Sequence, residues 1–139
     1  MVMLYHKNSY NYRVNIMLLR RLGVRLLGFD WGPGFVHKLT GEDVERLREL
    51  QREYQANRDL LLAPQEFLNQ NTDGAGNPLA RVYTRHEASA MFRKFSQVNT
   101  KIYFLNKRWI PLLGQMLPRA VEQVLAGLMG WHLWITAKK

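Results

Sequence analysis

The feature that most constrains the fold is a regular apolar pattern between residues 84 and 109. Apolar residues recur there at alternating steps of four and three, the heptad spacing of a helix that packs lengthwise against a partner. The members of this seam are Met91, Phe95, Val98, Ile102, Leu105 and Trp109. Thr84 and Glu87 form a capping-box pattern just before it. We therefore expect a long helix over 84–108 whose partner lies in this chain or in another subunit.

The last third of the chain is its most apolar part. Pro118 favours a break and the start of a new helix, and residues 120–137 hold a single charged side chain, Glu122. Trp131 and Trp134 lie near the end of this stretch, where aromatic side chains occur at a membrane interface. The stretch is short for a membrane span, which needs about 20 apolar residues. We expect an apolar helix near 118–136 that spans a membrane, lies in its interface or is buried in a protein core.

Breaker and loop signals divide the rest of the chain. Glycine and proline within residues 30–35 interrupt any helix formed by the first segment. Thr40 begins a helix near 40–63, with Leu47 and Tyr54 on its apolar stripe. Residues 69–78 form a Gly/Asn-rich loop. The predicted fold class is thus mainly α, with three to four helices, extended rather than compact. Its parts are a basic N-terminal segment, 1–29, and a single helical domain, 30–139.

Charge is distributed unevenly along the chain. Residues 1–29 contain five basic and no acidic side chains, and the whole chain carries a formal charge of +9. An Arg-rich, acid-free, amphipathic N-terminus is typical of a mitochondrial targeting segment, although a basic surface helix has the same composition. The charge predicts an anionic partner: lipid, RNA or an acidic protein. The candidate contacts to an anionic surface are Arg20, Arg21, Arg25, Lys94, Lys101, Arg108, Lys138 and Lys139.

The sequence contains few residues or motifs typical of catalytic, cofactor-binding or metal-binding sites. The chain has no cysteine, which excludes disulfides, zinc–thiolate sites, iron–sulfur clusters and thiol catalysis. Its four histidines lie far apart in sequence, and neither a nucleophile elbow nor a phosphate-binding or dinucleotide-binding loop occurs. We therefore predict no catalytic residue, no cofactor site and no metal site.

Two functions fit these patterns. The first is a structural accessory subunit of a large mitochondrial inner-membrane assembly, such as a respiratory complex or ATP synthase. Its partners would be other protein subunits and anionic lipid, with Trp131 and Trp134 at the membrane interface. The alternative is a mitochondrial ribosomal protein that binds rRNA through its basic helices. We prefer the first because the seam and the apolar C-terminus both require partners.

Overall fold

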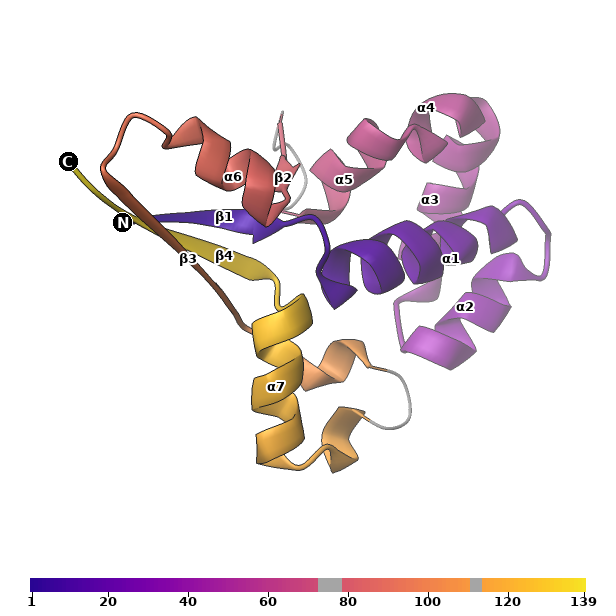
Figure 1. The fold of residues 1–139 in the computed structure, drawn as a ribbon. Helices are drawn as coiled ribbons and strands as arrows, with labels where there is room; N and C mark the ends of the chain where they lie inside the picture. The colour runs from indigo at the N-terminus through magenta and orange to yellow at the C-terminus, as the bar shows by residue number, and fades with distance from the viewer. Residues whose placement is uncertain (73–78, 111–113) are drawn as a thin grey trace. The chain divides into compact units, whose positions relative to one another are not determined.

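The chain contains a four-stranded mixed sheet as well as helices (Figure 1). The computed structural model describes residues 1–72, 79–110 and 114–139. The strands are β1 (Val2–His6), β2 (Val82–Tyr83), β3 (Gln97–Tyr103) and β4 (His132–Lys138). They lie in the order β2-β1-β4-β3, with β1 parallel to β2 and β4 antiparallel to both β1 and β3. The prediction of a mainly α fold is therefore wrong, because the chain is mixed α/β.

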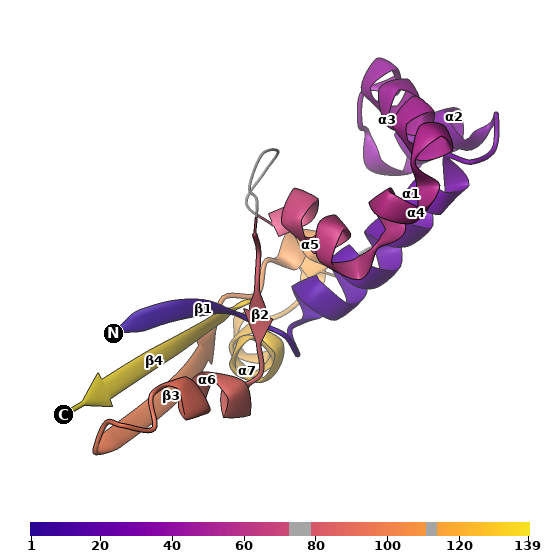
Figure 2. The same cartoon turned by 90° about the horizontal axis from the view of Figure 1, so that it is seen from above.

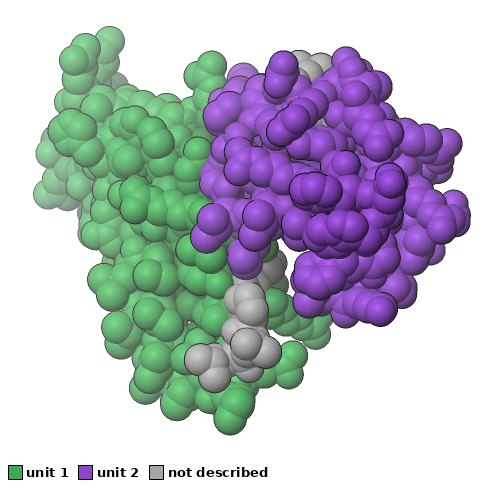
Figure 3. All heavy atoms as spheres, turned by 90° about the vertical axis from the view of Figure 1, so that its right-hand side faces the viewer, with its two compact units in different colours: residues 1–15, 81–139 green, residues 16–80 purple. Residues whose placement is uncertain are grey.

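The chain divides into two compact units, which Figure 3 colours separately. Unit 1 consists of residues 1–15 and 81–139 and contains the whole sheet. Unit 2 consists of residues 16–80, and its described elements are helices. The predicted helical character of residues 30–139 is wrong for unit 1, because that range supplies three of the four strands.

One face of the sheet forms the core of unit 1. Leu133 of β4 is fully buried and pairs with Leu4 of β1 on one side and with Ile102 of β3 on the other. Helix α6 (Arg85–Met91) packs on this face through Ala88, and Ile135 completes the cluster. Figure 1 shows α6 along one side of the sheet, and Figure 2 shows β1, β4 and β3 side by side.

The predicted helix over 84–108 is correct only at its beginning. The capping box is present: Glu87 N donates to Thr84 Oγ1 at 3.1 Å, and Thr84 N donates to Glu87 Oε2 at 2.8 Å. The helix ends at Met91, however, and β3 occupies residues 97–103. Val98 and Ile102 are four residues apart, a spacing that keeps two side chains on one face of a helix and also on one face of a strand.

The predicted apolar helix near 118–136 is also wrong in its second half. Helix α7 (Arg119–Met129) begins after Pro118, as expected, but it ends at Gly130 and β4 follows. Leu133 and Ile135 alternate with more exposed residues along β4, which is strand periodicity. Within the described parts of the chain, no helix is both long and apolar enough to cross a membrane.

Unit 2 is built from short helices. They are the π-helical segment η1 (Asn11–Arg20), which begins in unit 1, and α1 (Arg21–Leu26), α2 (Gly32–Thr40), α3 (Val44–Ala56), α4 (Arg58–Leu62) and α5 (Pro64–Thr72). Leu27, Val36 and Leu47 form a buried cluster between α2, α3 and the turn after α1. The chain does break before α2, at residues 27–31, but the glycines and proline that were predicted to make the break lie in the first turn of α2.

The helix predicted over 40–63 is divided in the structure. Thr40 ends α2, and Asp43 caps α3 by accepting a hydrogen bond from Arg46 N at 3.0 Å. Tyr54, on the predicted apolar stripe, is buried in α3. Most of the predicted Gly/Asn-rich loop, residues 73–78, lies outside the described residues.

Candidate binding surfaces of the sheet unit

The carboxyl ends of three strands meet at one end of the sheet. Because β1 and β3 are both antiparallel to β4, they run parallel to each other and to β2. Their last residues, His6, Tyr83 and Tyr103, therefore lie at the same end, away from the two chain termini (Figures 1 and 2). We call this the carboxyl end of the sheet. Open α/β sheets place their ligand sites beyond this end.

His6 is a buried histidine at the carboxyl end. Its Nδ1 lies 3.2 Å from the carbonyl oxygen of Gly130, and its exposed fraction is 2%. Burial lowers the pKa of His6, and Arg85 and Arg13 lower it further, while the hydrogen bond to Gly130 acts in the opposite direction. The ring is therefore held in its neutral form, with Nδ1–H donating to the carbonyl.

Four rings form an aromatic row across this end. Tyr5 stacks on Trp131 with centroids 4.6 Å apart, and Phe104 stacks on His132 at 4.8 Å. Tyr5 and His132 join the two pairs at 6.5 Å. The row runs from Trp131, which is 6% exposed, to Phe104, which is 46% exposed. Phe104 also has a φ of 68°, a left-handed conformation that bulky residues rarely adopt. The exposed end of the row is thus held by a strained backbone.

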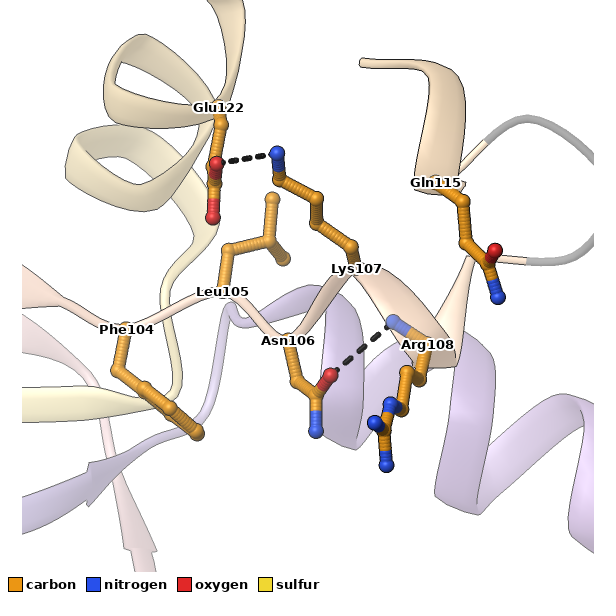
Figure 4. A pocket seen from close by; sticks show the side chains of 7 residues that line it. All are labelled: Phe104, Leu105, Asn106, Lys107, Arg108, Gln115 and Glu122. Carbon is orange, nitrogen blue, oxygen red and sulfur yellow. Dashed lines mark hydrogen bonds and ion pairs between the residues drawn. The ribbon is translucent and has the colours of Figure 1, made fainter. Parts of the chain in front are cut away.

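A hollow of about 570 Å³ opens beside Phe104. Its lining residues are Phe104, Leu105, Asn106, Lys107, Arg108, Gln115 and Glu122. The volume is within the range of small-molecule sites. Figure 4 shows two directions of side chains in this segment: Leu105 and Lys107 point toward α7, whereas Phe104, Asn106 and Arg108 point the other way. We call this cavity the carboxyl-end hollow.

The hollow has an unbalanced positive charge. Lys107 Nζ lies 2.7 Å from Glu122 Oε2 and also donates to the Leu117 carbonyl at 3.2 Å. This ion pair is about seven-tenths buried and neutralises Lys107. Arg108, in the 3₁₀ turn η2 (Lys107–Trp109), is exposed, and within the described residues no carboxylate pairs with its guanidinium. Asn106 Oδ1 accepts from Arg108 N at 3.0 Å and so fixes the start of this turn.

The face of the sheet opposite α6 is partly exposed and combines apolar, aromatic and polar side chains. Strand alternation and register place these residues there: Met3, Tyr5, Gln97, Asn99, Lys101, Tyr103, His132, Trp134, Thr136 and Lys138. We call them the open face. Met3 is 40% exposed and Tyr103 48%, while Tyr5, His132 and Trp134 are half-buried. The face therefore combines apolar and aromatic side chains with two lysines.

The structure separates the residues of the predicted seam. Met91 ends α6 and Phe95 lies in the following turn, and both are exposed. Val98 and Ile102 lie on the core face of β3, and Leu105 is buried beyond its end. The side chain of Trp109 is outside the described part of the structure. A single helical seam is therefore wrong, because a turn and a strand divide it.

The eight predicted cationic contacts also fall in different places. Arg20, Arg21 and Arg25 belong to helical unit 2, whereas Lys94, Lys101, Arg108, Lys138 and Lys139 belong to unit 1. Arg20 donates to Asn71 Oδ1 at 3.0 Å, and Arg21 donates to the Leu62 carbonyl. Lys101 and Lys138 share the open face. The predicted interface residues differ too: Trp131 is buried in the aromatic row, and Trp134 is on the open face.

Sequence reasoning named Arg108 and Trp131 among its candidate residues, but it did not predict the carboxyl end of the sheet as a site. His6 and Phe104 carry no motif, and their neighbours in space are distant in the chain: Gly130 for His6, and His132 for Phe104. The one available signal was the run Val2–Tyr5, which is apolar at every position, as in strands that are buried on both faces.

Comparison with protein-family models, with curated proteins and with solved structures finds no match for this chain. Among residues 1–72, 79–110 and 114–139, no three histidine, aspartate or glutamate side chains are grouped closely enough to hold a metal ion.

Proposed function

We propose that the chain is a non-catalytic structural component of a larger assembly, in which a protein partner packs on the open face. The observation that carries this proposal is the presence of large apolar side chains on both faces of β1 and β4. β1 and β4 place Leu4, Leu133 and Ile135 in the core, and they also place Met3, Tyr5 and Trp134 on the open face. Strands of this kind are typical of sheets covered on both sides. A partly exposed apolar face marks a protein-interaction site.

The edge of β1 supports the same proposal. β1 pairs with β2 only at Tyr5 and His6. In the described part of the chain, no strand pairs with Val2–Leu4 on that side. An edge strand of this kind presents unpaired backbone groups to a further strand. A partner that adds a strand there would extend the sheet and place its own side chains beside those of the open face.

The proposed subcellular location of the assembly depends on the N-terminal segment alone. Residues 1–29 are free of acids and rich in arginine, and this composition supports a mitochondrial location. The apolar C-terminal helix that pointed to the inner membrane is replaced by α7 and β4. The partner we propose is therefore another protein subunit, and anionic lipid is secondary.

The alternative function, binding of rRNA, is favoured by one observation. The open face places Lys101 and Lys138 on the same side of the sheet as Tyr103 and Trp134. Aromatic rings beside cations form stacking platforms for single-stranded nucleic acid. In this alternative RNA would bind the open face of the sheet, and not the basic helices that the sequence predicted.

The test is native electrophoresis of the tagged full chain from gently lysed mitochondria. The variant Met3→Glu puts a charge on the open face, and Val124→Glu is its matched control, because Val124 is an exposed apolar residue of α7 outside that face. We expect the wild-type chain and Val124→Glu to migrate in a large complex and Met3→Glu to migrate alone. Equal incorporation of both variants would show that the open face is not the docking surface.

Two treatments separate the alternatives. A protein assembly held by apolar packing should survive ribonuclease and about 0.5 M salt, whereas an rRNA contact should be lost, since phosphate contacts weaken steeply with salt. Release by either treatment would favour the ribosomal alternative. Absence of the chain from mitochondria would contradict both the mitochondrial assembly and the mitochondrial ribosome as its location. Purified Met3→Glu must retain the thermal midpoint of the wild type, which shows that its defect is in docking.

A further inference from the structure

The carboxyl-end hollow combines an exposed ring, a guanidinium and two amides. Phe104, Asn106 and Arg108 point to the same side of the chain between β3 and the end of η2 (Figure 4). Gln115, from the 3₁₀ turn η3 (Gly114–Met116), contributes the second amide to the lining. A cavity with one aromatic surface and a few convergent polar groups is the usual form of a small-molecule site.

The charges of the hollow select an anion. Lys107 is compensated by Glu122, so Arg108 supplies an uncompensated positive charge. The surroundings reinforce it: unit 1 has twelve basic and two acidic side chains, a formal charge of +10, whereas unit 2 has eight basic and nine acidic ones. An arginine fork binds carboxylate or phosphate groups through two parallel hydrogen bonds.

The ring of Phe104 selects a planar group. Its partner His132 lies 4.8 Å away at an interplanar angle of 12°, so the two rings form a parallel stack. Desolvation lowers the pKa of His132, which favours the neutral imidazole in this stack. With Phe104 46% exposed and lining the hollow, a planar ligand can contact the exposed part of its ring. Bases contact aromatic side chains in this way.

The geometry points to a nucleotide site in the carboxyl-end hollow. We propose that a base packs on Phe104, that a phosphate binds the Arg108 guanidinium, and that Asn106 and Gln115 donate hydrogen bonds to the base or sugar. A free mononucleotide and a nucleotide within single-stranded RNA share this chemistry. The site adjoins the open face through His132, on which Phe104 stacks, but none of its lining residues belongs to that face, and it does not depend on the proposed assembly role.

Calorimetric titration of the purified full chain tests the proposal. The probes are AMP, adenosine without phosphate, ribose 5-phosphate without base, and a seven-residue oligoadenylate. We expect AMP to bind at least tenfold more tightly than adenosine or ribose 5-phosphate, because each fragment lacks one of the two contacts. Oligoadenylate that binds more tightly than AMP would identify RNA as the source of the nucleotide, and equal affinities would identify free mononucleotide.

Three variants connect binding to the hollow. Arg108→Gln removes the guanidinium and should weaken AMP at least tenfold. Phe104→Asn removes the ring with a residue that tolerates a positive φ, and it should weaken AMP at least fivefold. The control is Arg25→Gln, because Arg25 lines a different hollow in unit 2.

Three results would overturn the proposal. They are the absence of binding of both AMP and oligoadenylate at millimolar concentration, equal affinity for ribose 5-phosphate and AMP, and equal loss in Arg25→Gln and Arg108→Gln. The first would show that the hollow is not a nucleotide site. The other two would show attraction of anions by charge alone.

Discussion

At Gly130 the end of α7 passes too close to β3 to admit a side chain. A Cβ atom placed there would lie 2.3 Å from the carbonyl oxygens of both Tyr103 and Ala126. The φ of Gly130 is −63°, which any residue can adopt, so space and not conformational freedom requires glycine. The carbonyl oxygen of Gly130 itself accepts a hydrogen bond from His6 Nδ1, and Trp131 N donates to Phe104 O at 2.7 Å. One missing methyl group thus permits the close contact at the carboxyl end.

We expect Gly130→Ala to destabilise unit 1 by about 2 kcal/mol or more, because both atoms that the methyl group meets belong to the backbone and cannot rotate away. The matched control is Gly127→Ala in α7, where nothing lies within 4 Å of the added Cβ. That substitution should be neutral or stabilise the helix by up to about 1 kcal/mol. Urea unfolding measures both changes. Equal stability of the two variants would contradict the close approach.

At the scale of elements, the sequence predicted helix beginnings better than helix ends. The capping box at Thr84 was correct because it depends on residues three apart, whose interaction is local. The continuation to residue 108 was wrong because Val98 and Ile102 are four apart, and this spacing satisfies helix and strand alike. This segment is a strand because it pairs with β4, from Gln97 with Lys138 to Tyr103 with His132. That pairing links residues 29 to 41 positions apart, so no local pattern contains it.

The candidate surfaces could be predicted only as single residues. Lys101 and Arg108 were predicted to contact an anionic surface, and both are exposed, but their neighbours come from distant segments. Tyr103 stands beside His132 through the register of β3 and β4, and Glu122 reaches Lys107 from α7. Charge is a property of the residue, and it was therefore available from the sequence. The hollow is a property of tertiary packing.

The capping box gives a prediction for α6. Thr84→Ala should lower the stability of unit 1 by about 1 kcal/mol, since the amide of Glu87 loses its acceptor. Thr84→Ser retains a hydroxyl group and should preserve stability. Hydrogen bonds from Thr84 are also the main cause of the lowered pKa of Glu87. An NMR titration should therefore show the pKa of Glu87 rising in Thr84→Ala and staying low in Thr84→Ser. Identical titrations in the two variants would contradict the capping box.

For the whole molecule, two charge patterns coincide with the two units. The sheet unit has a formal charge of +10 and unit 2 one of −1. The two acids of the sheet unit, Glu87 and Glu122, each face a lysine: Glu87 lies 3.7 Å from Lys7, and Glu122 pairs with Lys107. Unit 2 instead balances its charges along α3, where Glu42–Arg46 and Glu45–Arg48 form exposed pairs. Such exposed pairs add little stability. The positive charge of unit 1 is thus available to anionic partners, while its stability depends on the buried core and on groups such as His6.

The buried histidines make stability depend on pH. Burial lowers the pKa of both His6 and His132 below the ordinary histidine value of 6.5. Between the lowered values and 6.5 the unfolded chain binds more protons than the folded one, so the free energy of unfolding rises with pH in that window. The full contribution is present above pH about 6.5 and is lost as the pH falls below it.

We therefore expect the urea midpoint of the wild type, followed by tryptophan fluorescence, to fall between about pH 7.5 and pH 5.5, where ordinary carboxylates remain ionised. The double variant His6→Asn, His132→Asn removes both groups and should have a lower midpoint that changes much less with pH. His86→Asn, at an exposed position on α6, is the matched control and should follow the wild type. A wild-type slope retained in the double variant would mean that other groups titrate in this window. The neutral state of His6 would then not be what stabilises the carboxyl end of the sheet.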